Sequence, residues 1–101
     1  PFRAIILNLD KKSDLVEEFC DNMYSRFIED GIDIFYDDRD ERPGIKFSDA
    51  DLLGIPFVII IGKNYLKKKS VTIINKYSDK EIEIPESDAT NQIKKLIKLD
   101  D

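Results

Sequence analysis

Apolar residues in this chain come in short blocks separated by polar and charged segments. Residues 3–9 and 57–61 are almost continuously apolar, which is typical of strands covered on both faces of a sheet. Residues 32–36 form a third apolar block of strand length. These three blocks are predicted to be the central strands of a sheet.

The segment between residues 3–9 and residues 32–36 has apolar residues at three- and four-residue steps, which is the spacing of an amphipathic helix. Ser13 is a suitable amino-terminal cap for this helix, and Gly31 is a suitable left-handed stop. The predicted apolar face consists of Leu15, Val16, Phe19, Cys20, Met23, Phe27 and Ile28.

Two further helices are predicted. Residues 46–53 form a short helix that ends at Gly54, and a final helix begins after Ser87 or Asp88. The positions expected to face inward are Phe47, Ala50 and Leu53 in the first of these helices, and Ala89, Ile93, Leu96 and Ile97 in the second.

Residues 71–75 and 81–84 flank a polar connection and are predicted to form a hairpin, whose second strand alternates apolar and acidic residues like an exposed edge. The element order is therefore β-α-β-α-β-β-β-α. Two successive β-α-β units imply three parallel strands with right-handed crossovers. The predicted fold class is α/β, a three-layer α/β/α sandwich with a five-stranded mixed sheet.

The length, composition and charge of the chain exclude several classes of protein. With 101 residues and 42% hydrophobic composition, residues 1–101 are expected to form a single domain. The lone Cys20 is interpreted as a buried thiol in a soluble, cytoplasmic protein, and no apolar run reaches membrane-spanning length. The absence of histidine excludes histidine-dependent triads and ordinary zinc sites. A net charge of −5 argues against nonspecific coating of DNA or RNA.

A charged segment, residues 37–47, follows the second strand. Seven of its eleven residues are charged, so we expect it to be an exposed recognition loop, turned by Pro43 and Gly44. Ligands of open α/β sheets gather at the carboxyl ends of parallel strands. This segment and Gly62-Lys63-Asn64 are therefore expected to converge on one rim.

Three runs carry a resemblance to a known family. They are Asp37-Asp38-Arg39-x-Glu41-Arg42-Pro43-Gly44-x-Lys46-Phe47, then Asp49-x-x-Leu52-x-Gly54-Ile55-Pro56, then Ile61-Gly62-Lys63. Nearly the whole chain resembles the carboxy-terminal anticodon-binding domain of bacterial-type prolyl-tRNA synthetase, a class II aminoacyl-tRNA synthetase.

The resemblance implies that the chain recognises tRNA with a proline anticodon and works beside a catalytic domain of a proline–tRNA ligase. Proline anticodons have guanine at their second and third positions. The class II motifs, the ATP site with its magnesium and the proline pocket have no counterpart in these residues. We therefore expect no catalytic residue, metal or cofactor in this chain, and neither a membrane nor DNA as a partner.

Reading an unpaired guanine takes a carboxylate for its N1–H and N2–H donors and a cation for O6 and N7. The hypothesis is that Asp38 or Glu41 accepts from guanine. The cations that would donate to a base or phosphate are Arg39, Arg42, Lys46 and Lys63. Tyr36 and Phe47, or the guanidinium plane of Arg39, would provide a stacking surface.

Structural interpretations compete with these roles. The charged segment can be a solvated turn in which aspartates pair with arginines, and Asp37 can accept backbone N–H groups of the following turn. Phe47 suits the core as well as a stacking surface. The basic triplet, Lys67, Lys68 and Lys69, can either grip an RNA backbone or simply be solvated.

Two other functions fit parts of the sequence. A magnesium-dependent receiver-like signalling domain would use Asp10, Asp37 and Asp38, but Gly62 and Lys63 stand where a further acid after the third strand would be expected. A non-catalytic protein-interaction or accessory domain of the same fold would use the predicted edge strand at residues 81–84.

Overall fold

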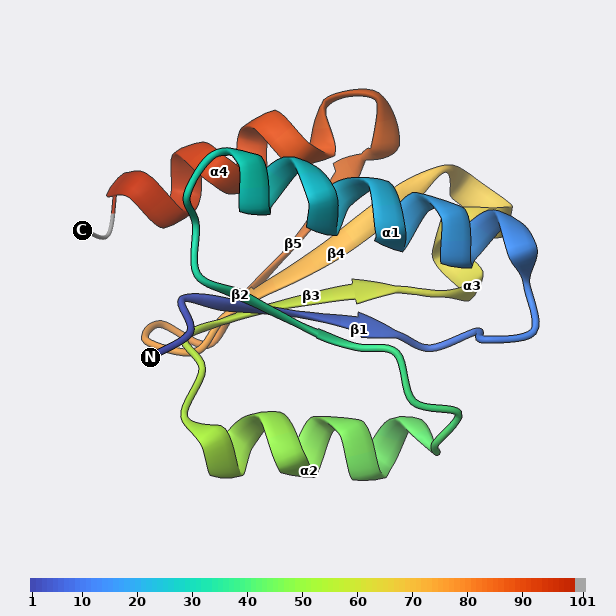
Figure 1. Ribbon diagram of the computed structural model, residues 1–101, viewed down its shortest axis with the longest axis horizontal. Helices are drawn as coiled ribbons and strands as arrows, with labels where there is room; N and C mark the ends of the chain where they lie inside the picture. The colour runs from blue at the N-terminus through green and yellow to red at the C-terminus, as the bar shows by residue number, and fades with distance from the viewer. Residues whose placement is uncertain (100–101) are drawn as a thin grey trace.

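The computed structural model describes residues 1–99 and contains a five-stranded mixed sheet with helices on both faces (Figure 1). The elements are β1 (Ala4–Asn8), α1 (Asp14–Glu29), β2 (Ile34–Asp37), α2 (Pro43–Leu53), β3 (Phe57–Ile61), α3 (Lys63–Lys68), β4 (Ser70–Asn75), β5 (Lys80–Pro85), the 3₁₀ turn η1 (Glu86–Asp88) and α4 (Ala89–Leu99). The three-layer α/β architecture expected from the sequence is confirmed.

The strands lie in the order β2-β1-β3-β4-β5. β1 pairs in parallel with both β2 and β3, so that Ile6 is in register with Tyr36 on one side and with Ile59 on the other. β3, β4 and β5 pair antiparallel. The three parallel strands, the antiparallel hairpin and the edge position of β5 are therefore as predicted.

The two faces of the sheet carry separate apolar clusters. α1 and α4 lie on one face, and α2 lies on the other (Figure 1). The larger cluster lies under α1 and α4 and includes Cys20, Phe27 and Ile93. The smaller cluster lies under α2 and is built around Leu7 and Ala50. Both faces are covered at β1 and β3, which explains the continuous apolar sequence of these two strands.

α1 begins and ends where the sequence indicates. The hydroxyl oxygen of Ser13 accepts a hydrogen bond from the backbone N–H of Val16 at 3.2 Å, and Gly31 has a φ of 73° just beyond the helix. Leu15 and Ile28 are exposed. Including these two residues in the inner face was wrong, because they lie at the margins of the apolar stripe.

α2 begins three residues earlier than predicted. Pro43 is its first residue and Gly44 lies inside the helix, so these residues do not form the expected turn. The fixed φ of proline suits a first helical position, where a missing N–H costs nothing. Leu53 faces solvent instead of the core, and the buried residues of the helix are Lys46 and Ala50.

α3 was not predicted, because six residues are too short to show a helical period. Tyr65 is its buried residue, and it carries Lys67 and Lys68, which the sequence placed in an exposed connection. The helix ends at Lys69, whose φ of 55° is left-handed.

The last helix agrees with the sequence. α4 follows directly after η1, and its buried residues Ala89, Ile93 and Ile97 were all predicted to face inward. Within residues 1–99, no helix is both long and apolar enough to cross a membrane.

Candidate nucleic-acid interface

Polar groups gather at one edge of the sheet, where the three parallel strands end. The ends of β1, β2 and β3 lie side by side because β1 is parallel to both neighbours. A hollow of about 350 Å³ opens beside them, and its lining residues are Leu9, Pro43, Ile60, Gly62, Lys63, Asn64 and Thr72. The start of α2 and the segment after β3 thus converge, as predicted. We call residues 38–42 and 62–64 the rim.

Lys46 is fully buried beneath the rim. Its Nζ donates hydrogen bonds to the backbone oxygen of Asn8 at 2.7 Å and to that of Asp37 at 3.1 Å. It therefore ties the ends of β1 and β2 to α2. A buried ammonium group needs such acceptors, and none of its surface is left to meet RNA. Lys46 supports the rim in this structure, in place of the expected base or phosphate contact.

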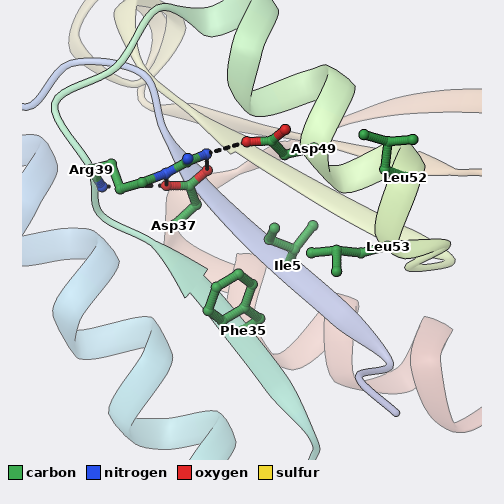
Figure 2. Close-up of a pocket in the computed structure, with 7 residues that line it drawn as sticks. All are labelled: Ile5, Phe35, Asp37, Arg39, Asp49, Leu52 and Leu53. Carbon is green, nitrogen blue, oxygen red and sulfur yellow. Dashed lines mark hydrogen bonds and ion pairs between the residues drawn. The ribbon is translucent and has the colours of Figure 1, made fainter.

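Asp37 is also buried, so the charged segment is not exposed along its whole length. Its Oδ1 accepts from the backbone N–H of Arg39 at 3.3 Å, which confirms the structural interpretation of this aspartate. It also forms a two-pronged ion pair with the Arg39 guanidinium, in which both side-chain contacts measure 2.9 Å. Figure 2 shows the same guanidinium reaching Asp49 on α2, at 2.8 Å.

These contacts shift the acid–base properties of the cluster. Burial alone would raise the pKa of Asp37, but the hydrogen bonds from Arg39 and the charge of Lys46 outweigh it and hold the pKa below its ordinary value. Burial lowers the pKa of Lys46, and the Asp37 carboxylate offsets part of that effect. The hydrogen bonds that Arg39 donates to the carboxylates of Asp37 and Asp49 raise the pKa of Arg39. Arg39 is therefore a permanent cation with two carboxylate partners.

Besides Arg39, four predicted site residues are exposed on the rim: Asp38, Glu41, Arg42 and Lys63. The carboxylate of Glu41 accepts from the backbone N–H of Arg42 at 3.0 Å, which orders it at the start of α2. Two carboxylates and two cations thus lie at the same edge of the sheet, in positions that solvent reaches.

The two candidate stacking residues do not form one surface. Tyr36 packs against the larger cluster, with its ring 5.8 Å from that of Tyr24. Its hydroxyl oxygen accepts from the side chain of Asn8 at 3.4 Å, and burial raises the pKa of the phenol. Phe47 packs against the smaller cluster on the opposite face. Each ring is half-buried and contributes to packing.

Two residues that support the rim were missed at the sequence level. Asp49 lies three residues after Lys46, a spacing that places both on one side of a helix, and this spacing was the available signal. Asn8 is a buried polar residue at the end of an apolar strand. Its side-chain oxygen accepts from the backbone N–H of Asp10 at 2.9 Å, and its backbone oxygen holds Lys46.

The acidic residues of the rim do not assemble a cation site. Among residues 1–99 there is no group of three or more histidine, cysteine, aspartate or glutamate side chains that could hold a metal ion. The Asp37 carboxylate, which the receiver-like alternative required, is bound to Arg39.

Two proteins similar to this chain are both proline–tRNA ligases. The chain is 39% identical over 98 residues to a proline–tRNA ligase from Citrifermentans bemidjiense, a match covering 97% of this chain and 17% of the relative. It is 42% identical over 85 residues to the proline–tRNA ligase of Maridesulfovibrio salexigens, covering 84% of this chain and 15% of the relative. The chain thus spans less than a fifth of these proteins.

Among solved structures, prolyl-tRNA synthetase from Cryptosporidium parvum, complexed with L-proline and AMP, has the same fold. It superposes with a TM-score of 0.82 at 22% identity, over 97% of this chain and 22% of that protein. The model of the family described as anticodon binding domain matches residues 3–96. With nearly all of its described elements inside that match, this chain belongs to the anticodon-binding domain family.

Proposed function

We propose that this chain recognises the anticodon of proline tRNA for a proline–tRNA ligase, whose ATP-dependent chemistry is carried out by a catalytic part outside these residues. The observation that carries the proposal is the 39% identity to a proline–tRNA ligase over 97% of the chain. The family membership supports anticodon binding, and the names of the relatives supply the amino acid.

The exposed groups of the rim suit guanine. An unpaired guanine presents two N–H donors on one edge and the acceptors O6 and N7 beside them. Asp38 and Glu41 provide carboxylates for the donors, while Arg42 and Lys63 provide cations for the acceptors or for a phosphate. The hollow beside Pro43 and Lys63 offers space for an unstacked base.

Arg39 has a different part in this proposal. Its Nε donates to Asp37 and its Nη2 donates to both Asp37 and Asp49, yet half of its side chain is exposed. A guanidinium held by its edges leaves its planar faces free, and RNA bases stack on such planes. We therefore assign Arg39 to base stacking, and direct base-edge donation to Arg42 and Lys63.

The test is binding of the 101-residue chain to an anticodon stem-loop of proline tRNA and to one whose two guanines are replaced by adenines. We expect at least roughly tenfold tighter binding to the first RNA, since a bidentate contact discriminates by about 1–3 kcal/mol. Equal affinity for both RNAs would contradict anticodon reading.

Individual residues are tested with matched controls. Arg42→Ala is expected to weaken binding to the proline stem-loop. The control is Arg26→Ala, at an exposed position in the last turn of α1, which is expected to leave binding unchanged. Glu41→Gln is expected to reduce the preference for guanine over adenine, with Glu29→Gln as its control. Unchanged preference in both Glu41→Gln and Asp38→Asn would remove the carboxylates from the proposal.

A further inference from the structure

A second hollow lies on the α2 face, between the free edge of β2 and the carboxyl-terminal half of α2. It has a volume of about 400 Å³ and its lining residues are Ile5, Phe35, Asp37, Arg39, Asp49, Leu52 and Leu53. Figure 2 shows the apolar side chains of β1, β2 and α2 gathered beside the bridge from Arg39 to Asp49.

The hollow is the centre of a larger apolar surface. The ring of Phe2 stacks on that of Phe35, with centroids 5.2 Å apart. Leu52 and Leu53 are 85% and 57% exposed on α2. We call Phe2, Phe35, Leu52 and Leu53 the apolar flank. Phe35 connects its members, because the ring stacks on Phe2 and also lines the hollow together with Leu52 and Leu53. The flank is therefore a cluster and not a set of scattered exposed residues.

The charges around the flank argue against RNA as its ligand. Arg39 is the cation lining this hollow, and its guanidinium is bound to the carboxylates of Asp37 and Asp49. A lining with two acids, one paired cation and large apolar side chains offers nothing to a phosphate backbone, which needs unpaired cations. Its chemistry instead suits an apolar protein surface.

The size of the relatives identifies that protein surface. This chain corresponds to 17% of the Citrifermentans bemidjiense ligase, so in such a protein it has a much larger neighbour in the same polypeptide. Phe2 itself belongs to the flank, and residues leading into β1 therefore run along this surface. Domain interfaces within one chain bury about 600–1,500 Å², and a cluster of four large side chains suits the centre of such an interface.

We infer that the apolar flank docks the anticodon-binding domain against the rest of the ligase. This inference rests on the proposed function. Docking places Leu52 and Leu53 in the interface, and the ion pairs of Arg39 lie between the docked face and the rim.

Hydrogen exchange tests the docking directly. A chimera is made in which this chain replaces the matching segment of the Citrifermentans bemidjiense ligase, and exchange is compared with that of the 101-residue chain alone. Amides of residues 33–37 and 49–54 are expected to exchange at least roughly tenfold more slowly in the chimera, because docking removes their access to water. Amides of α1 that lie away from the flank are expected to be unaffected.

Matched leucine substitutions test the flank itself. The pair Leu52→Asp and Leu53→Asp is expected to restore fast exchange in the chimera. The control pair is Leu99→Asp and Leu15→Asp, whose wild-type side chains are 84% and 58% exposed on the opposite layer, and it is expected to keep the protection. Thermal unfolding of each variant of the isolated chain checks that it folds.

Equal exchange in the chimera and the isolated chain would overturn the docking, whether or not the chimera charges tRNA. Protection that survives the Leu52 and Leu53 substitutions would also overturn it. A chimera that shows protection but cannot discriminate proline tRNA by its anticodon would contradict the proposed function and leave the docking supported. If the flank substitutions unfold the chain, the docking is judged from the exchange rates of the unsubstituted chimera and the unsubstituted isolated chain.

Discussion

The Nζ atom of Lys46 lies 3.1 Å from the backbone oxygen of Asp37 and 3.9 Å from its carboxylate, and both side chains are buried. This relationship joins the end of β2 to α2 on either side of residues 38–42. The exposed part of the rim is therefore held at both ends by buried polar contacts, although its own side chains are solvated.

Lys46→Met is expected to lower the free energy of unfolding by about 1–3 kcal/mol, because methionine fills the space of the stem but leaves buried carbonyl oxygens without a donor. Urea denaturation measures the effect. The exposed Lys63→Met is the control and is expected to change stability by less than about 0.5 kcal/mol. Equal effects of the two substitutions would show that Lys46 is not a support.

The Asp37 carboxylate makes stability depend on acid pH. Its pKa in the folded chain lies below the ordinary value of 3.8, so the unfolded chain binds the proton more readily. The contribution is complete above the unfolded pKa and is lost as pH falls through the folded pKa. Asp37→Asn is expected to lower stability at neutral pH and to flatten this acid limb in unfolding experiments across the range. If Asp37→Asn loses stability at acid pH as steeply as the unsubstituted chain, other carboxylates cause that loss.

The Cys20 thiol is expected to be inert in the folded chain. Burial raises its pKa to about 12, and the thiolate is the reactive form. At about pH 8, a thiol reagent should therefore react only as fast as the chain opens, and rapidly once urea unfolds it. A fast reaction without denaturant would contradict the buried position of this side chain.

Two glycines, one inside α2 and one directly after it, are expected to respond oppositely to substitution by alanine. Gly44 lies inside the helix with nothing within 4 Å of an added Cβ, so Gly44→Ala should raise stability by about 0.5–1 kcal/mol. Gly54 ends the helix with a φ of 68°, so Gly54→Ala should lower stability by about 1–2 kcal/mol. Thermal unfolding of both variants checks the signs, and a stabilising Gly54→Ala would be inconsistent with the left-handed end.

The salt dependence of stem-loop binding separates the basic residues. Lys63→Gln is expected to lower the slope of log affinity against log salt by about one unit if Lys63 contacts a phosphate. Joint replacement of Lys67, Lys68 and Lys69 by glutamine tests the triplet in the same way. An unchanged slope for the triplet would assign it to the solvated surface, and an unchanged slope for Lys63 would leave it at most a base contact.

The strands and the longest helix, α1, could be predicted because each is indicated by residues close together in the sequence. Apolar blocks marked the strands, and the spacing from Val16 to Phe27 marked α1. The start of α2 was missed because Pro43 followed by Gly44 is compatible with either a turn or a helix start. The short α3 offered too few residues for a period.

The rim was predicted in location more than in detail. Strand order determined that residues 38–42 and Lys63 would lie at one edge, which follows from topology alone. The burial of Lys46 depends on the path of its side chain beneath α2, and a charge-rich sequence gives the opposite impression. Whether Arg39 pairs with Asp49 likewise depends on how α2 lies against the sheet.

The residues that anchor the rim are Asp37 at the end of β2, Lys46 and Asp49 on α2, and Arg39 between the two elements. The side chains of Asp38 and of residues 40–42 are all exposed. These exposed positions can therefore be substituted without disturbing the buried contacts that hold the segment in place. Under the proposed function, related sequences are expected to change their nucleotide preference through these exposed positions while Asp37, Arg39, Lys46 and Asp49 stay in place, so a new specificity need not be accompanied by a new hydrophobic core.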